Sequence, residues 1–222
     1  MASETAVPTR VKICGLSTEA TLTAALEAGA DWIGLVHFAR SPRHVTLAQA
    51  AALSALARRR AQRVLLLVDP DDALVASAVA AADPDLIQLH GRESPERVAA
   101  IRAATGRPVM KALGIATRAD LAALPTYAAV ADRILLDAKA PADATLPGGN
   151  GRRFDWELLR GTDLPHGTML SGGLDAANVA EALMRTGLRA VDVSSGPDVD
   201  GPRDLFCSST TSSMNLTALR DM

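Results

Sequence analysis

Short apolar runs alternate along this chain with longer, alanine-rich stretches in which apolar residues recur at helical spacing. Eight of the runs have the length and the Val, Ile and Leu content of buried strands. We predict strands at RVKIC, WIGLVHF, RVLLLVD, DLIQLHG, PVMKALG, DRILLDA, TMLSGG and AVDVSSG. The helices predicted between them span Ser17 to Ala28, Leu47 to Arg60, Leu74 to Ala82, Glu96 to Thr105, Arg118 to Leu124 and Ala176 to Thr186.

Capping residues mark the ends of several of these helices. Ser94 precedes Pro95 in SPERVAAI, and Asp175 stands in a capping position in LDAANVAEAL. The segments EAGAD, ATGRP and RTGLR place a glycine just past a last turn, where it can adopt the left-handed conformation that closes a helix. The whole chain therefore reads as strand then helix, repeated.

About eight strand–helix units fit either a closed (β/α)₈ (TIM) barrel or an open doubly wound sheet, both of the α/β class. A Gly-x-Gly-x-x-Gly after the first strand and a Walker-type lysine motif would favour the open sheet, and the sequence has neither. We therefore predict a TIM barrel, with residues 1–222 as a single domain, since such barrels commonly exceed 200 residues.

Composition narrows the classes of function. The chain is 48% hydrophobic but only 3% aromatic, so its core must be built mainly from Ala, Leu and Val. A net charge of -2 argues against a nucleic-acid partner. No apolar stretch is long enough to span a bilayer and the N-terminus has no export signal, so we expect no membrane association and a cytoplasmic location. Cys14 and Cys207 form no metal-type spacing, and we expect Cys14 to be free and reduced.

The carboxyl ends of the strands meet at one rim of a barrel, where the chemistry of this fold is found. Cys14 ends the first strand, and Lys12 projects to the same face, so its ammonium would favour a thiolate able to act as nucleophile or base. A buried cysteine can equally be a small core residue. Asp137 follows a wholly apolar strand, where partial burial would favour the protonated acid. A helix cap or a partner of Lys139 is the alternative for Asp137.

The last two strands end in SGGL and VSSG, and loops at these places form the usual phosphate site of the barrel. The alternative is that their glycines only make tight turns. Arg43 follows the second strand and could fork around a carboxylate, although a loop arginine can also be a solvated charge. Together these residues suggest proton transfers on a sugar phosphate with no metal and no redox cofactor.

Seven ordered motifs carry a resemblance to a known family. KICG, SPRHV, QLHG, LLDA, GGNGRRFDW, LSGGL and DVSSG closely resemble phosphoribosylanthranilate isomerase of tryptophan biosynthesis, over about Val11 to Asp204. The resemblance implies an Amadori rearrangement of N-(5-phosphoribosyl)anthranilate, with this small molecule as the ligand and no cofactor. The protein would be a monomer or a homodimer.

The resemblance also implies roles for particular residues. Asp137 would protonate the furanose ring oxygen, and the Cys14 thiolate would remove the C2 proton. Arg43 would contact the anthranilate carboxylate, Asp192 would lie beside the substrate, and the glycine-rich PGGNGRRFDW resembles the loop that closes after strand six. The phosphate would be held by Gly172, Gly173, Ser195 and Gly196.

The chain departs from the family at its end. A covering amphipathic helix is expected after GPRD, but residues 205–222 are rich in Ser and Thr, so we predict an atypical C-terminal segment and an altered or missing last helix. Two other functions stay open. One is a different phosphosugar isomerase on the same barrel, such as the histidine-pathway enzyme, which Cys14 disfavours because that pattern has an aspartate at the end of strand one. The other is a phosphate-ligand binding module without turnover.

Overall fold

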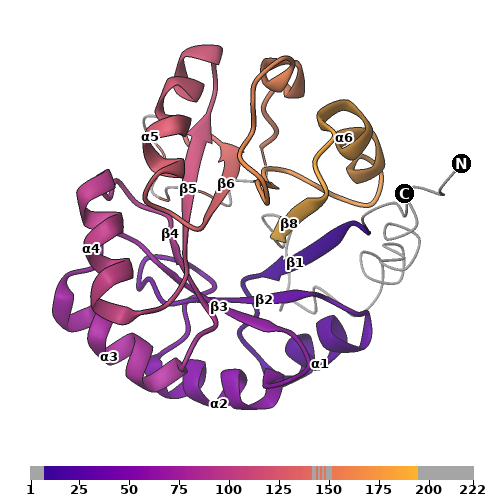
Figure 1. Cartoon of the computed structure of the whole chain (residues 1–222). Helices are drawn as coiled ribbons and strands as arrows, with labels where there is room; N and C mark the ends of the chain where they lie inside the picture. Colours follow the sequence, from indigo (N-terminus) through magenta and orange to yellow (C-terminus); the bar gives the residue numbers. More distant parts are fainter. Residues whose placement is uncertain (1–7, 142–143, 145, 147, 149–151, 195–222) are drawn as a thin grey trace, which may run out of the picture.

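A computed structural model of the chain describes residues 8–141, 144, 146, 148 and 152–194. Within them, eight parallel strands pair in sequence order, and the last strand pairs with the first to close a barrel. The helices lie around the outside of the barrel (Figure 1). The predicted α/β class and TIM-barrel fold are confirmed. Residues 205–222, for which an atypical segment is predicted, lie outside the described residues.

All eight predicted strands are present, although most are shorter than predicted because their last residues belong to the loops of the rim. Register across the closing pair places Lys12 opposite Asp192, and Cys14 opposite Gly34 on the other side. The strands are β1 (Arg10–Cys14), β2 (Trp32–Val36), β3 (Gln62–Leu67), β4 (Leu86–Leu89), β5 (Val109–Ile115), β6 (Arg133–Ala138), β7 (Met169–Leu170) and β8 (Ala190–Ser194).

The helices begin and end close to the predicted places. Ser94 caps its helix by accepting a hydrogen bond from the Arg97 backbone N–H, and Gly106 and Gly187 close theirs in the left-handed conformation, as predicted. The helical elements are α1 (Glu19–Glu27), α2 (Leu47–Ala57), α3 (Asp72–Ala82), α4 (Pro95–Thr105), the 3₁₀ helix η1 (Arg118–Ala123), α5 (Leu124–Ala128), the 3₁₀ helix η2 (Trp156–Leu159) and α6 (Val179–Thr186).

Two local predictions need correction. The segment predicted as a helix over Arg118 to Leu124 is a 3₁₀ helix that passes directly into the short α5, where Pro125 occupies the first turn, a position that suits proline because it has no N–H to donate. Asp175 does not cap α6 itself. Its carboxylate accepts hydrogen bonds from the backbone N–H groups of Ala177 and Asn178, so it stabilises the turn before a helix that begins at Val179.

Two layers of different character fill the inside of the barrel. The layer toward the amino-terminal ends of the strands is an apolar cluster that includes Trp32, Val64, Leu86, Met110 and Leu135. Toward the carboxyl ends, the buried inward positions include a small cluster of Cys14, Val36 and Leu66 and five polar side chains, namely Lys12, Gln88, Asp137, Ser171 and Asp192. Burying polar groups is unfavourable unless they are hydrogen-bonded, so this polar layer marks where function should be sought.

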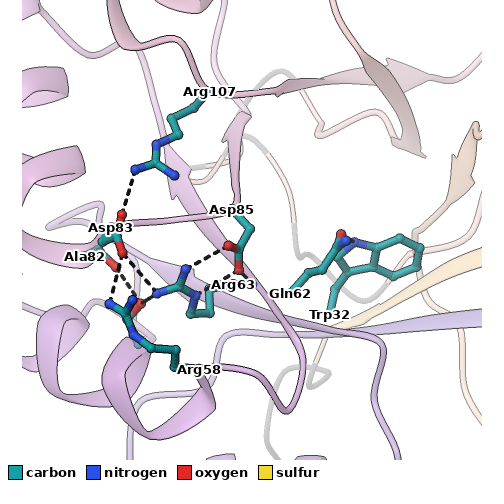
Figure 2. Close-up of polar contacts among 9 residues, drawn as sticks. Trp32, Arg58, Gln62, Arg63, Ala82, Asp83, Asp85 and Arg107 are labelled. Atoms are coloured by element: carbon teal, nitrogen blue, oxygen red, sulfur yellow. Dashed lines mark hydrogen bonds and ion pairs between the residues drawn. The ribbon is translucent and has the colours of Figure 1, made fainter.

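At the amino-terminal mouth, charged residues form a network on the outside of the barrel (Figure 2). Arg63, on β3, forms a two-pronged pair with Asp85, with Nη2–Oδ1 of 2.7 Å and Nε–Oδ2 of 2.8 Å. Asp83 accepts from Arg58 at 3.0 Å and from Arg107 at 2.7 Å. The network ties the loops before β3, β4 and β5 together.

Candidate active site

The ends of β1 and β8 bring three functional side chains together inside the barrel. Nζ of Lys12 lies 2.8 Å from Oδ1 of Asp192, and both side chains are almost fully buried. Oγ of Ser171 donates to the other carboxylate oxygen of Asp192 at 3.3 Å. Lys12 also interacts with Cys14 two residues further along the same face. The predicted common face of Lys12 and Cys14 is therefore present, with Asp192 as a third member.

Cys14 is free and buried, as predicted, but its electrostatic environment differs from the prediction. Burial has the largest effect and raises the pKa of the Cys14 thiol, and the negative charge of Asp192 raises it further. The Lys12 ammonium lowers it without offsetting burial, so the net pKa is raised. Burial therefore opposes the thiolate that the Lys12 ammonium favours.

Lys12 responds in the opposite way. Burial lowers its pKa, but attraction to Asp192 and to the Cys14 sulfur more than compensates, so the pKa of Lys12 is raised and its ammonium is retained. The buried Lys12 ammonium stabilises negative charge on either neighbour, the Asp192 carboxylate or the Cys14 sulfur. The cluster can thus support a thiolate when Cys14 loses its proton.

Gly34, on β2, makes room for this cluster. A Cβ at that position would lie 2.7 Å from Sγ of Cys14 and 3.1 Å from Nζ of Lys12. Real Cβ atoms essentially never approach other atoms as closely as the first of these distances. The absence of a side chain at Gly34 therefore lets the sulfur and the ammonium project inward from β1.

Asp137 ends β6 on the inward face, with a side chain that is only 7% exposed. Its Oδ1 accepts the Ala138 backbone N–H at 2.8 Å, and its Oδ2 lies 3.3 Å from Nε2 of His90. Lys139 pairs with Asp120 at 2.6 Å, so the alternative of an Asp137–Lys139 pair is not what the structure has. Cys14 and Asp137 both lie toward the carboxyl ends of their strands, with side chains that point into the barrel. Because all strands of the barrel are parallel, these ends meet at one mouth.

Arg43 lies over the turn that follows Cys14. The aliphatic part of its side chain occupies the space beside Gly15, whose φ of 87° also favours glycine, and its charge acts on the Cys14 thiol. The structure thus brings the predicted carboxylate-binding arginine next to the predicted base. An arginine at this place can present its planar fork to a ligand in the mouth.

The predicted phosphate-binding glycines are only partly described. Gly172 and Gly173 follow β7 with φ of 92° and 59°. A Cβ on Gly172 would lie 2.8 Å from the Ala138 backbone nitrogen and 3.0 Å from Oδ1 of Asp137, so this glycine packs directly on the acid. Ser195 and Gly196, the other two predicted residues, lie outside the described residues, as does part of the loop after strand six.

A cavity of about 690 Å³ opens at this mouth. Asp137 and His90 line it together with Phe38, Val68 and Lys139. Cys14 lies beneath the apolar part of this lining, in a cluster with Val36 and Leu66 against which Phe38 and Val68 pack. A cavity of this size with a few converging polar groups is typical of a small-molecule site.

Sequence reasoning missed a buried ion pair that holds the loop after β4. Nζ of Lys111 lies 2.8 Å from Oε2 of Glu93, and both side chains are at most 2% exposed. Glu93 also accepts the backbone N–H groups of Asp69 and Gly91. This pair fixes the loop that begins with His90. Acidic and basic residues 18 positions apart gave no sequence signal, because only the pairing of β4 with β5 brings them together.

Comparisons with known proteins agree with this geometry. The family model described as N-(5'phosphoribosyl)anthranilate (PRA) isomerase matches residues 11–207. The N-(5'-phosphoribosyl)anthranilate isomerase of Azorhizobium caulinodans is 68% identical over 186 residues, which cover 84% of this chain and 82% of that relative. The crystal structure of phosphoribosyl anthranilate isomerase from Thermotoga maritima has a TM-score of 0.79 at 30% identity, covering 95% of this chain and 97% of that one. A structure of such an isomerase in complex with reduced 1-(o-carboxyphenylamino)-1-deoxyribulose 5-phosphate has a TM-score of 0.78 at 27% identity, covering 96% and 100%.

Proposed function

This chain belongs to the N-(5'-phosphoribosyl)anthranilate isomerase family, and we propose that Cys14 and Asp137 carry out the proton transfers of its reaction. The enzyme converts N-(5-phosphoribosyl)anthranilate into 1-(2-carboxyphenylamino)-1-deoxyribulose 5-phosphate, a step of tryptophan biosynthesis. The observation that carries the residue assignment is the placement of a thiol and a carboxyl group at one mouth of the barrel.

Asp137 acts first, as the general acid. Its proton passes to the furanose ring oxygen, the bond from C1 to that oxygen breaks with its electron pair remaining on oxygen, and the nitrogen lone pair forms the C=N bond of a Schiff base. The Ala138 N–H already bonded to Oδ1 stabilises the carboxylate that this step creates. Gly172, packed against the same oxygen, keeps other atoms away from it.

Cys14 then acts as the general base. Its thiolate removes the proton from C2, which gives the enolamine, and a shift of protons from the enol oxygen to C1 gives the ketone. Because burial raises the pKa of Cys14, forming the thiolate costs free energy, and Lys12 reduces this cost.

The remaining residues bind and orient the substrate. Arg43 holds the anthranilate carboxylate above Cys14, and the backbone of Gly172 and Gly173 holds the phosphate together with Ser195 and Gly196. Asp192 pairs with Lys12 and lies beside the sugar of the substrate, close to Cys14. The reaction needs no cofactor and no metal in this scheme, since each step is a proton transfer.

Steady-state kinetics with N-(5-phosphoribosyl)anthranilate test the assignment. Loss of a group that transfers a proton reduces rates by about 10²- to 10⁴-fold, so kcat should fall by such factors in Cys14→Ala and in Asp137→Asn. Affinity for a phosphate-containing product analogue should change little in either variant. Full activity of Cys14→Ala would remove the base from the scheme. An unchanged KM in Arg43→Ala would remove the arginine from carboxylate binding.

The cellular setting and assembly are part of the proposal. In the part of the chain that the structure describes, none of the helices is long and apolar enough to cross a membrane. We propose that residues 1–222 form one domain that works in the cytoplasm as a monomer or a homodimer. Light scattering of the purified chain distinguishes these assemblies, and complementation of a tryptophan-requiring strain with residues 205–222 replaced shows whether the atypical segment limits activity.

A further inference from the structure

Gln88 is a fully buried amide whose NH₂ group contacts one hydrogen-bond partner and whose carbonyl oxygen contacts none among the described residues. It lies on β4 at an inward-facing position, and its Nε2 lies 2.9 Å from Nδ1 of His90. Its Oε1 is buried and has no hydrogen-bond partner among the residues that the structure describes. Leaving a buried carbonyl unpaired is unfavourable. The contact with His90 is therefore the interaction of Gln88 that an apolar side chain at this position could not make.

The contact with Gln88 determines which nitrogen of His90 carries the proton. A neutral imidazole has one N–H donor and one acceptor nitrogen. An amide N–H of Gln88 directed at Nδ1 makes Nδ1 the acceptor, which leaves the proton on Nε2. That nitrogen lies 3.3 Å from Oδ2 of Asp137. His90 therefore presents an N–H donor, and not a lone pair, to the carboxyl group of Asp137.

We propose that Gln88 is a positioning residue for the isomerase reaction: it holds His90 as the tautomer protonated on Nε2, which directs the acid proton of Asp137 toward the substrate. This inference rests on the proposed role of Asp137. With the opposite tautomer, the lone pair of Nε2 would accept the Asp137 proton and hold it away from the ring oxygen. With this tautomer, the His90 N–H occupies one lone pair of Oδ2 and the proton of Asp137 is free to point into the cavity.

The same arrangement stabilises the product of the proton transfer. When the O–H bond of Asp137 breaks and the ring oxygen takes the proton, Oδ1 of the resulting carboxylate already accepts the Ala138 N–H at 2.8 Å, and Nε2 of His90 lies 3.3 Å from Oδ2. Donors that are in place before charge develops stabilise a transition state without reorganisation. Neither Gln88 nor His90 gains or loses a proton, so the balance of the reaction is unchanged.

Nitrogen-15 NMR of the histidine side chains in the full chain tests the tautomer directly. The His90 signals are assigned by their absence in His90→Asn. At pH 8 we expect the neutral ring of wild-type His90 to carry its proton on Nε2, and Gln88→Met, which keeps the side-chain volume, to give a mixture of tautomers. A wild-type ring protonated on Nδ1 overturns the proposal, and this measurement needs no turnover.

Kinetics of the same variant separate positioning from a merely structural role. General acid catalysis contributes about 10²- to 10⁴-fold, so a misdirected acid should lower kcat by roughly 10-fold with KM changed by less than about twofold. The matched control is Gln62→Met, the same substitution at the amino-terminal mouth, where Gln62 bonds Trp32, and it should leave kcat unchanged. An unchanged kcat in a folded Gln88→Met overturns the proposal. If wild type has no turnover while His90 is protonated on Nε2, the proposed function fails and the tautomer assignment stands.

Discussion

The two mouths of this barrel use charged residues in different ways. At the amino-terminal mouth, Arg63 forms a two-pronged pair with the partly exposed Asp85 (Figure 2), and its Nη1 also lies 3.3 Å from Oγ of Ser54 and 3.6 Å from Oδ2 of Asp83. At the carboxyl-terminal mouth, Lys12 is enclosed in the barrel and divided between Asp192 and Cys14. The arginine binds two carboxylates and a hydroxyl and ties the loops together, whereas a cation shared between a carboxylate and a thiol makes the protonation of the thiol depend on the cation. The first arrangement serves stability and the second serves chemistry.

Breaking the shared cluster should have the largest effect on stability. In Lys12→Met the carboxylate of Asp192 stays buried without its cation, and removing one member of a buried pair costs about 3–5 kcal/mol. The free energy of unfolding, measured with urea and circular dichroism, should fall by this amount, and activity should fall with it. The double variant Lys12→Met/Asp192→Leu removes both charges and should regain most of the stability without regaining activity. A loss below about 1 kcal/mol in the single variant would contradict the enclosed pair.

Breaking the surface pair should affect stability alone. Arg63→Met removes hydrogen bonds to a carboxylate, which contribute about 1.5–3 kcal/mol each where they are buried and less here because Asp85 is partly exposed. We expect a loss of roughly 1–3 kcal/mol in the same urea experiment, with kcat and KM at wild-type values. A fall in kcat at unchanged stability would show that the amino-terminal mouth communicates with the site.

The sequence alone predicts which side chains meet at the carboxyl-terminal mouth, because the alternation of side chains along a strand depends only on neighbouring residues. Alternation along RVKIC places Lys12 and Cys14 on one face, and the end of RILLDA places Asp137 at the rim. Lys12 favours the thiolate, as predicted, but burial raises the pKa of Cys14 by more, and burial is a property of the whole barrel. Asp192, which raises the pKa of Cys14 further, lies 180 residues away from Lys12 in the sequence. The function of Gly34 depends on the β1–β2 register, so a glycine within WIGLV gives no local signal.

One glycine beside each mouth of the barrel extends the comparison: Gly172 after β7 and Gly106 before β5. Gly172 has a φ of 92°, and a Cβ there would collide with the atoms that hold Asp137. Gly106, at the end of α4, has a φ of 62°, and a Cβ there would meet no other atom within 4 Å. Alanine in a left-handed conformation costs about 1–2 kcal/mol, so Gly106→Ala should lower the free energy of unfolding by that amount, and Gly172→Ala should lower it by more because of the collision. Only Gly172→Ala should also lower kcat, because only there does the methyl group reach the acid.

The smallest predicted effect concerns pH. Side-chain hydrogen bonds from Arg63 lower the pKa of Asp85 below its usual range, with burial acting against them. A lowered folded-state pKa means that the stabilisation is fully present above the unfolded pKa of about 3.9 and is lost as pH falls from there toward the folded value. Because solvent screens this partly exposed pair, Asp85→Asn should be less stable than wild type by only about 1 kcal/mol at pH 6, and the difference should shrink below about pH 4. Asp163→Asn, at an exposed aspartate, is the matched control and should show no such convergence. Melting curves at pH 6, 4 and 3 measure both differences, and a gap for Asp85→Asn that stays constant across this series would mean that the carboxylate is not held by Arg63 in solution.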